Sequence, residues 1–298
     1  MLERAEMTVS DYLPSSERAD VEEAPAGSVP KIAVVLPDPI TARACLDVGE
    51  AAALAVEGTL SVVHIGADPA SMLSSAEEID IQFLRERYEG TAGERVAQVR
   101  SVFDEWLSNR RGTGPVSWRD CSGDIDQCLD LETRDADLVI VPRTGNLDAR
   151  DVVHGLLFHS HKLCLLPAYR QQGDMPLLTH VAVGWKPDGK VERTIKAALP
   201  WLRAARQVTA ICVDDDKGRS SENAAAEQFA ALHVDVTTAS LRSHPESVAS
   251  ALVGHAASIG ATCIVAGAYR HGEFLEMIVG RVTRDLLTHA QVPLLLMH

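Results

Sequence analysis

Residues 181–192, VAVGWKPDGKVE, place the spacing G-x4-G-K directly after a short apolar run. A strand, such a turn and a helix form a P-loop, which ends in a Ser or Thr whose hydroxyl holds Mg²⁺ beside the nucleotide phosphates. The last position here is Val191, which has no oxygen, and Asp188 puts a carboxylate inside the turn. We therefore interpret the Pro-Asp-Gly sequence as a surface turn that leads into a helix.

A second glycine-containing turn lies near the C-terminus, where the apolar run ATCIVAGA precedes a helical pattern. Gly267 and Gly280 flank this turn, Arg270 and Arg281 lie beside them, and Thr283 follows. Glycines let backbone N–H groups approach a phosphate, and a helix N-terminus favours an anion. Two cations near a helix N-terminus could hold a phosphate, a sulfate or an acidic partner. In the structural alternative, the glycines serve a tight turn and a helix junction, and the arginines are solvated.

Histidines and one cysteine gather in HGLLFHSHKLC. His154 and His159 fit the zinc spacing H-x3–5-H loosely, whereas His159 and His161 are two residues apart and do not share a helix face. We favour an ordinary polar helix end over a metal site. The acidic run Asp214 to Asp216 follows a predicted strand and is interpreted as a solvated loop rather than as a Mg²⁺ site.

Six cysteines are scattered through the chain, mostly within apolar patterns. Cys121 and Cys128 flank the start of a predicted helix, but a separation of seven is not the C-x-x-C of redox proteins. Buried free thiols are the expectation for all six. No G-x-S-x-G motif occurs, so no nucleophile elbow is predicted.

The composition favours a parallel α/β protein, because hydrophobic residues make up 46% of the 298 residues and aromatic residues only 4%. The net charge of −14 argues against nucleic-acid and membrane partners, since both require clustered Lys and Arg. No apolar run is long enough for a transmembrane helix, and the N-terminus lacks the basic and apolar regions of a secretory signal. We therefore expect a cytoplasmic protein.

Strand and helix patterns alternate along the chain, and the series occurs twice. Residues 1–29 lack this periodicity and predict a flexible acidic tail. The expected domains are residues 30–170 and 171–298. Two landmarks support duplication: DADLVIVPRTG corresponds to GATCIVAGAYR, and VVHGLLFHSHKLCLLP corresponds to MIVGRVTRDLLTHAQVPLLL. Both pairs are offset by 125 residues, whereas the first strands are offset by 150, which assigns extra residues and a second helix to region 67–112.

The predicted fold is α/β, with two tandem doubly wound, mostly parallel five-stranded sheets flanked by helices. Ligands of such sheets bind at the carboxyl ends of the strands, where the strand order reverses. Each half ends in a short apolar strand, KLCLLP or VPLLLM, whose exposed edge requires a partner. We expect these two strands to pair and to join the halves as a pseudo-twofold, intramolecular dimer.

The stretch VAGAYRHGEFLEMIVGRVTRDLLTHAQVPLLLMH resembles the universal stress protein family, strongly in the second half and faintly in the first. Within the second half, GAY stands at the end of the predicted fourth strand and Trp185 at the end of the predicted first strand. Both features resemble a tandem group of that family. The resemblance implies an adenine-nucleotide alpha-hydrolase-like fold. ATP-binding members carry G-x2-G-x9-G-[ST] here, and in this chain Gly267 and Gly280 match the outer glycines.

Other positions of the second half depart from that motif. Arg270 replaces the middle glycine, Arg281 replaces the terminal hydroxyl residue, and Thr283 matches a second hydroxyl position. Lys186 takes the place of an Asp that helps to hold the nucleoside, and Val213 at the end of the second strand completes the expected cofactor-binding set.

The first half departs from the motif in a complementary way. Pro142 replaces its first glycine, Gly145 and Gly155 remain, and Leu156 and Phe158 replace both hydroxyl positions. No ATP is expected there.

The leading function that the resemblance implies is a non-catalytic cytoplasmic stress-response protein. It senses or holds a small anionic ligand in its second half, with ATP or another adenine nucleotide as the candidate cofactor and no metal other than Mg²⁺ with that nucleotide. A slow ATPase or other nucleotide-handling enzyme is one alternative, and a ligand-free interaction scaffold is the other. The expected partners are the chain itself, including a homodimer, and an unidentified protein.

Overall fold

The computed structural model describes residues 28–68, 84–169, 176–214, 219–242, 248–267 and 281–298. Its strands form one sheet in the order β3-β2-β1-β4-β5-β10-β9-β6-β7-β8. The strands are β1 (Lys31–Leu36), β2 (Thr59–Ala67), β3 (Val116–Gly123), β4 (Leu138–Ile140), β5 (Cys164–Leu166), β6 (Val181–Trp185), β7 (Val208–Asp214), β8 (Thr237–Arg242), β9 (Cys263–Gly267) and β10 (Leu294–Met297).

Helices cover both faces of this sheet. One hydrophobic core lies between the sheet and α1, α3, α6, α7 and α8, and the other lies between the sheet and α4, α5, α9 and α10. The helices are α1 (Pro39–Ala55), α3 (Ala92–Asn109), α4 (Ile125–Glu132), α5 (Leu147–Phe158), α6 (Gly189–Ala197), α7 (Leu199–Ala204), α8 (Arg219–Ala231), α9 (Val248–Ser258) and α10 (Arg281–His289). The fold is therefore the predicted doubly wound α/β arrangement.

The strands form where the sequence has short continuous apolar runs. Five of the six residues of β1 are buried, because helices cover both faces of a parallel sheet. Polar caps then start the helices. The Asp38 carboxylate accepts hydrogen bonds from the amides of Ile40 and Thr41 at the start of α1, and Thr91 with Glu94 forms a capping box at α3.

One predicted helix is interrupted. The pattern VERTIKAALPWLRAA predicts a single helix, but α6 ends at Ala197 and α7 begins at Leu199. Pro200 lies at the start of α7, where its missing amide proton costs nothing, and it cannot continue the hydrogen bonding of a preceding helix.

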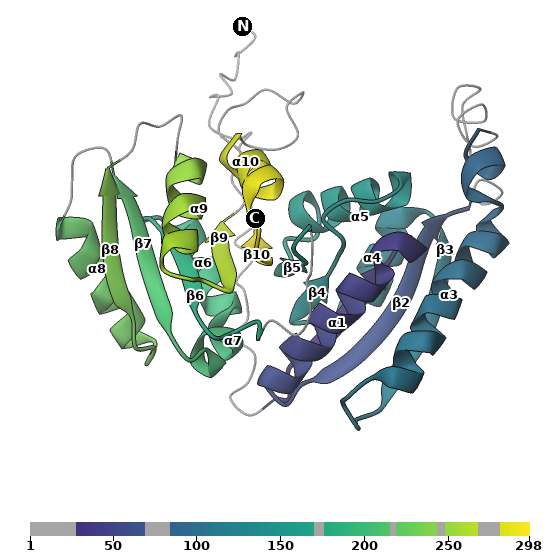
Figure 1. Ribbon diagram of the computed structural model, residues 1–298, viewed down its shortest axis with the longest axis horizontal. Helices are drawn as coiled ribbons and strands as arrows, with labels where there is room; N and C mark the ends of the chain where they lie inside the picture. Colours follow the sequence, from purple (N-terminus) through teal and green to yellow (C-terminus); the bar gives the residue numbers. More distant parts are fainter. Residues whose placement is uncertain (1–27, 69–83, 170–175, 215–218, 243–247, 268–280) are drawn as a thin grey trace, which may run out of the picture.

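The two halves meet at the centre of the sheet (Figure 1). β5 pairs antiparallel with β10, with Leu166 opposite Leu294 and Leu165 opposite Leu295, so the predicted pairing of these strands is confirmed. Both strands are entirely buried. Contacts outside the sheet also join the halves, because Trp201 of α7 donates its indole N–H to the carbonyl of Ala52 in α1 over 3.1 Å.

The structure corrects the expectation of six free thiols. Cys121 at the end of β3 forms a disulfide with Cys128 of α4, with 5.8 Å between their Cα atoms. The remaining cysteines are free and buried: Cys45, Cys164, Cys212 and Cys263. Spacing along the chain gave no signal for the bond, because a strand and the following helix bring the two side chains together. Among the described helices, none is both long and apolar enough to cross a bilayer.

Candidate functional site

The candidate site lies in the second half, where the strand order reverses. β6 pairs with β7 on one side and with β9 on the other, and all three strands are parallel. Val183 lies opposite Val265, and Trp185 lies opposite Cys212, so the three carboxyl ends share one edge of the sheet. This is where open α/β sheets bind ligands.

Several predicted site residues gather at this edge. Gly267 is the last residue of β9 and is buried, Lys186 follows β6 and is exposed, and Val213 of β7 is half-buried. Arg270 and Gly280 lie outside the described residues.

The start of α10 belongs to the same edge. Arg281 is the first residue of the helix, and Thr283, in the first turn, is 2% exposed. Because α10 connects the carboxyl end of β9 with the amino end of the parallel neighbour β10, its N-terminus must lie toward the carboxyl edge.

An anion can be held by this arrangement. The N-terminus of α10 presents backbone N–H groups and a partial positive charge, and exposed Lys186 adds a full positive charge at the same edge. The turn after β6 lacks P-loop chemistry, because Val191 is 3% exposed and packs into the hydrophobic core from α6.

The equivalent edge of the first half contains a buried ion pair. Arg85 lies in the helical residues 84–89, and its guanidinium binds both carboxylate oxygens of Asp148, with 2.7 Å between Nη1 and Oδ1. Asp148 also accepts a hydrogen bond from the amide of Ala67, the last residue of β2. Both side chains of the pair are at least 98% buried. The first turn of α5 thus carries a buried carboxylate that is paired with an arginine, and Asn146 caps the helix.

Arg95 and Asp38 extend this polar cluster. Arg95 of α3 donates hydrogen bonds to the carbonyls of Gly90 and Ala67. Asp38 is 2% exposed and lies against Gly145, where an added Cβ would come within 2.2 Å of its Oδ2 atom. Gly145 therefore allows this carboxylate to approach the backbone closely. The glycine that matches a phosphate-turn position serves packing here.

His64 of β2 is the titratable centre of the cluster. Its Nδ1 atom lies 2.7 Å from Oδ1 of Asp120 in β3, and a carboxylate only accepts, so Nδ1 carries the proton. The buried Nε2 atom has no hydrogen-bond partner among the described residues. Burial lowers the pKa of His64, while the hydrogen bond and charge of Asp120 and the charge of Asp148 oppose the shift and Arg95 adds to it.

This lowered pKa predicts that acid destabilises the protein through His64. The unfolded chain binds a proton near pH 6.5 and the folded chain only at lower pH, so stability is complete above that range and falls as the pH drops below about 6.5. Urea unfolding at pH 7.5 and pH 5.5 measures the loss. A His64→Gln variant retains a donor to Asp120 and should lose less stability over this interval. An equal loss in both proteins would contradict the assignment.

Arg143 shows that a first-half turn residue supports the second half. Its guanidinium donates to the carbonyls of Ala290 and Val292, after the end of α10, at 2.6 and 2.8 Å, and lies over the ring of Tyr169. Burial lowers its pKa to about 10, and Tyr169 opposes the shift. Leu156, at a former hydroxyl position, is fully buried. That the first half binds no ATP stays a prediction.

The remaining candidates from the sequence are not assembled into a site. The rings of His154 and His159 lie 5.1 Å apart, whereas His161 stacks on His298 at 5.4 Å. In the described part of the chain, no group of three or more His, Cys, Asp or Glu side chains could hold a metal ion. Asp214 ends β7, and the two aspartates after it lie outside that part.

The polar cluster of the first half was not predicted from the sequence. Its members come from six segments between the end of β1 and the start of α5: Asp38, His64, Arg85, Arg95, Asp120 and Asp148. Asp148 offered one usable signal, since an acidic residue early in a helix after an Asn cap marks a helix start. Arg85 and Arg95 lie in predicted helices, where an arginine is equally compatible with a solvent-exposed face.

The chain was compared with known proteins. Residues 189–298 match the model of the universal stress protein family. This part of the second half is therefore similar to universal stress protein domains. A universal stress protein from Archaeoglobus fulgidus DSM 4304 covers 89% of this chain and 95% of its own, with a TM-score of 0.58 and 14% identity. A functionally unknown protein from Pseudomonas aeruginosa PAO1 covers 91% and 92%, with a TM-score of 0.51 and 14% identity.

These two structures extend over both halves, so the universal stress protein fold is present twice in the chain. A universal stress protein in complex with cAMP matches 41% of this chain and 98% of its own, with a TM-score of 0.35 and 15% identity. No curated protein matches the chain.

Proposed function

We propose that this universal stress protein binds a small anionic ligand, with an adenine nucleotide such as ATP or AMP as the candidate, at the carboxyl edge of its second half. The protein holds or senses the ligand without chemical turnover. The observation that carries the proposal is the meeting of Gly267, exposed Lys186 and the N-terminus of α10 where the strand order reverses.

The contrast between the halves also supports this proposal. At the first edge, the first turn of α5 carries the Asp148 carboxylate, which holds Arg85 and would repel a phosphate. At the second edge, the residue after the first strand is a lysine. A single ligand site per chain is therefore proposed.

Two other functions predict different results. A slow ATPase requires a group that activates water, and at the second edge this would have to be a carboxylate such as Asp188, in the turn after β6, or Asp214, the last residue of β7. An interaction scaffold requires no ligand at all. We propose a cytoplasmic location. The four free thiols support it, because thiols persist in reducing compartments.

Calorimetric titration with ATP and AMP tests the proposed site. Lys186→Ala and Arg270→Ala should each weaken binding about tenfold, since a hydrogen bond or contact with a charged group contributes roughly 1.5–3 kcal/mol. Lys196→Ala is the matched control, because this exposed lysine of α6 pairs with Glu192. Its affinity should equal that of the wild type.

Each other result selects another function. No heat at millimolar nucleotide would reject the ligand site and favour the scaffold. Phosphate release above the background rate would establish an enzyme. Equal losses in the Lys196 variant would mean that the nucleotide responds to overall charge rather than to this edge.

A further inference from the structure

We propose that Cys121 and Cys128 form a reversible redox site that exchanges with small neutral or cationic disulfides, and that its oxidised form clamps the edge strand β3 to α4. This proposal is independent of the nucleotide site, which lies in the other half.

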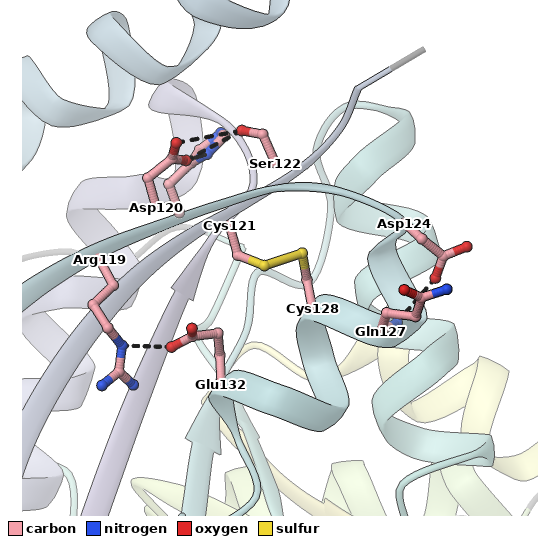
Figure 2. The surroundings of a disulfide bond; sticks show 9 residues. Arg119, Asp120, Cys121, Ser122, Asp124, Gln127, Cys128 and Glu132 are labelled. Carbon is pink, nitrogen blue, oxygen red and sulfur yellow. Dashed lines mark hydrogen bonds and ion pairs between the residues drawn. A yellow bond between two sulfur atoms is a disulfide. The ribbon is translucent and has the colours of Figure 1, made fainter. Parts of the chain in front are cut away.

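The fold brings the two cysteines together from a strand and the helix that follows it. Cys121 lies near the end of β3 and Cys128 at the fourth residue of α4, and the turn between them is fixed by Asp124, whose carboxylate accepts the amide proton of Gln127. Figure 2 shows the bond reaching from strand to helix, with the Arg119–Glu132 ion pair farther along the same two elements. The Cα separation of 5.8 Å lies within the usual range for disulfides.

Accessibility distinguishes this pair from the other cysteines. Cys121 is half-buried on β3, the outermost strand of the first half, which pairs only with β2. Because Cys121 is only partly covered, a small external thiolate can approach it. By contrast, the four free cysteines are buried, and burial raises the pKa of Cys164 and Cys263 to about 12. Those thiols are poor nucleophiles at neutral pH.

Charge around the pair selects the oxidant. Exposed carboxylates cluster from the end of β3 through α4: Asp120, Asp124, Asp126 and Asp130. Arg119, two residues before Cys121, is paired with Glu132. A negative surface repels anionic disulfides and attracts cationic ones, so cystamine is a better oxidant here than oxidised glutathione.

The exchange balances without another reactant. A cysteine thiolate attacks one sulfur of the small disulfide and releases a first small thiol, which leaves a mixed disulfide on the protein. The second cysteine, after losing its proton, attacks the protein sulfur of the mixed disulfide and releases a second small thiol. The two cysteines lose two electrons in total, and the small disulfide gains them.

The state of the bond is transmitted to the buried cluster through β3. Asp120 immediately precedes Cys121 and holds Nδ1 of His64, and Ser122 donates to the same carboxylate at 3.2 Å. In the oxidised form the end of β3 is tied to α4. In the reduced form this tie would be absent, and only the pairing with β2 and the Arg119–Glu132 ion pair would hold the end of β3, so Asp120 should move relative to His64. His64 therefore reports the redox state.

The test uses the full chain, reduced and then exposed to cystamine, hydroxyethyl disulfide or oxidised glutathione. Alkylation after unfolding and intact mass should count four free thiols in the oxidised protein and six in the reduced protein. Raising the salt concentration should slow the reaction with cystamine and accelerate that with oxidised glutathione, because salt screens opposite charge effects. This sign criterion is independent of the intrinsic reactivity of each disulfide.

Two variants sharpen the result. Asp124→Asn preserves the helix cap and removes one charge, so it should reduce the preference for cystamine. In a Cys121→Ser, Cys128→Ser protein, the NMR signals of His64 should be the same in oxidant and reductant, whereas in the wild type they should differ. Simultaneous modification of all six thiols, a persistent mixed disulfide, or identical salt dependence for both charged oxidants would overturn the proposal. If the double variant does not fold, the thiol count of the wild-type protein by mass still tests the proposal.

Discussion

Replacing Asp148 with alanine is expected to lower the free energy of unfolding by about 3 kcal/mol. The change leaves the guanidinium of Arg85 in a site where its side chain is 2% exposed. Glu89, at 2.7 Å from Nε, remains as one partner, which places the loss at the lower end of the range for broken buried ion pairs. The amide of Ala67 also loses its acceptor.

Chemical denaturation followed by circular dichroism measures this loss. Asp104→Ala is the matched control, because it breaks the exposed pair with Arg100 and should cost less than about 1 kcal/mol. A combined Arg85→Met, Asp148→Leu protein should regain most of the stability, since well-packed apolar residues can replace a buried pair. Equal losses for the Asp148 and Asp104 variants would show that the buried pair has no special weight.

The Trp201→Ala variant is expected to lose about 3–5 kcal/mol of stability. Trp201 is 2% exposed, belongs to the core that runs through both halves, and donates its indole N–H to the carbonyl of Ala52. Removing the ring leaves a cavity at the junction of α7 with α1. The two halves should then unfold in separate steps rather than in one.

Urea unfolding monitored by circular dichroism checks this result. Trp201→Phe keeps most of the apolar volume and loses the hydrogen bond, so its cost should be about 1–2 kcal/mol. A loss below about 1 kcal/mol in the alanine variant, with a single unchanged transition, would mean that the junction depends on the pairing of β5 with β10 and on Arg143 rather than on Trp201.

The sequence predicted the fold well because its signals are local and repeated. Short apolar runs flanked by helix patterns identify the strands, as at KIAVVL, and their order limits the sheet to few topologies. The pairing of β5 with β10 followed from two apolar edges that require cover. The interruption of the predicted helix near Pro200 was not predicted, although a proline is a known signal for a helix boundary.

The polar sites were harder to predict because their contacts join distant positions. Arg85 and Asp148 are 63 residues apart, and only the docking of two helices at one sheet edge makes them partners. The Cys121–Cys128 bond depends on where β3 ends and how α4 leaves it, which no spacing rule for thiols specifies. In the second half, the sequence predicted a ligand site at the carboxyl edge of the sheet. The structure describes Gly267, Lys186 and Thr283 at that edge.

The union of β5 and β10 within one polypeptide has a genetic consequence. In a symmetric dimer of identical chains, any mutation at one edge appears at both, so neither copy can change alone. Here each edge is encoded by its own codons. A lineage could therefore rebuild the first edge around Arg85 and Asp148 while selection acted separately on the second.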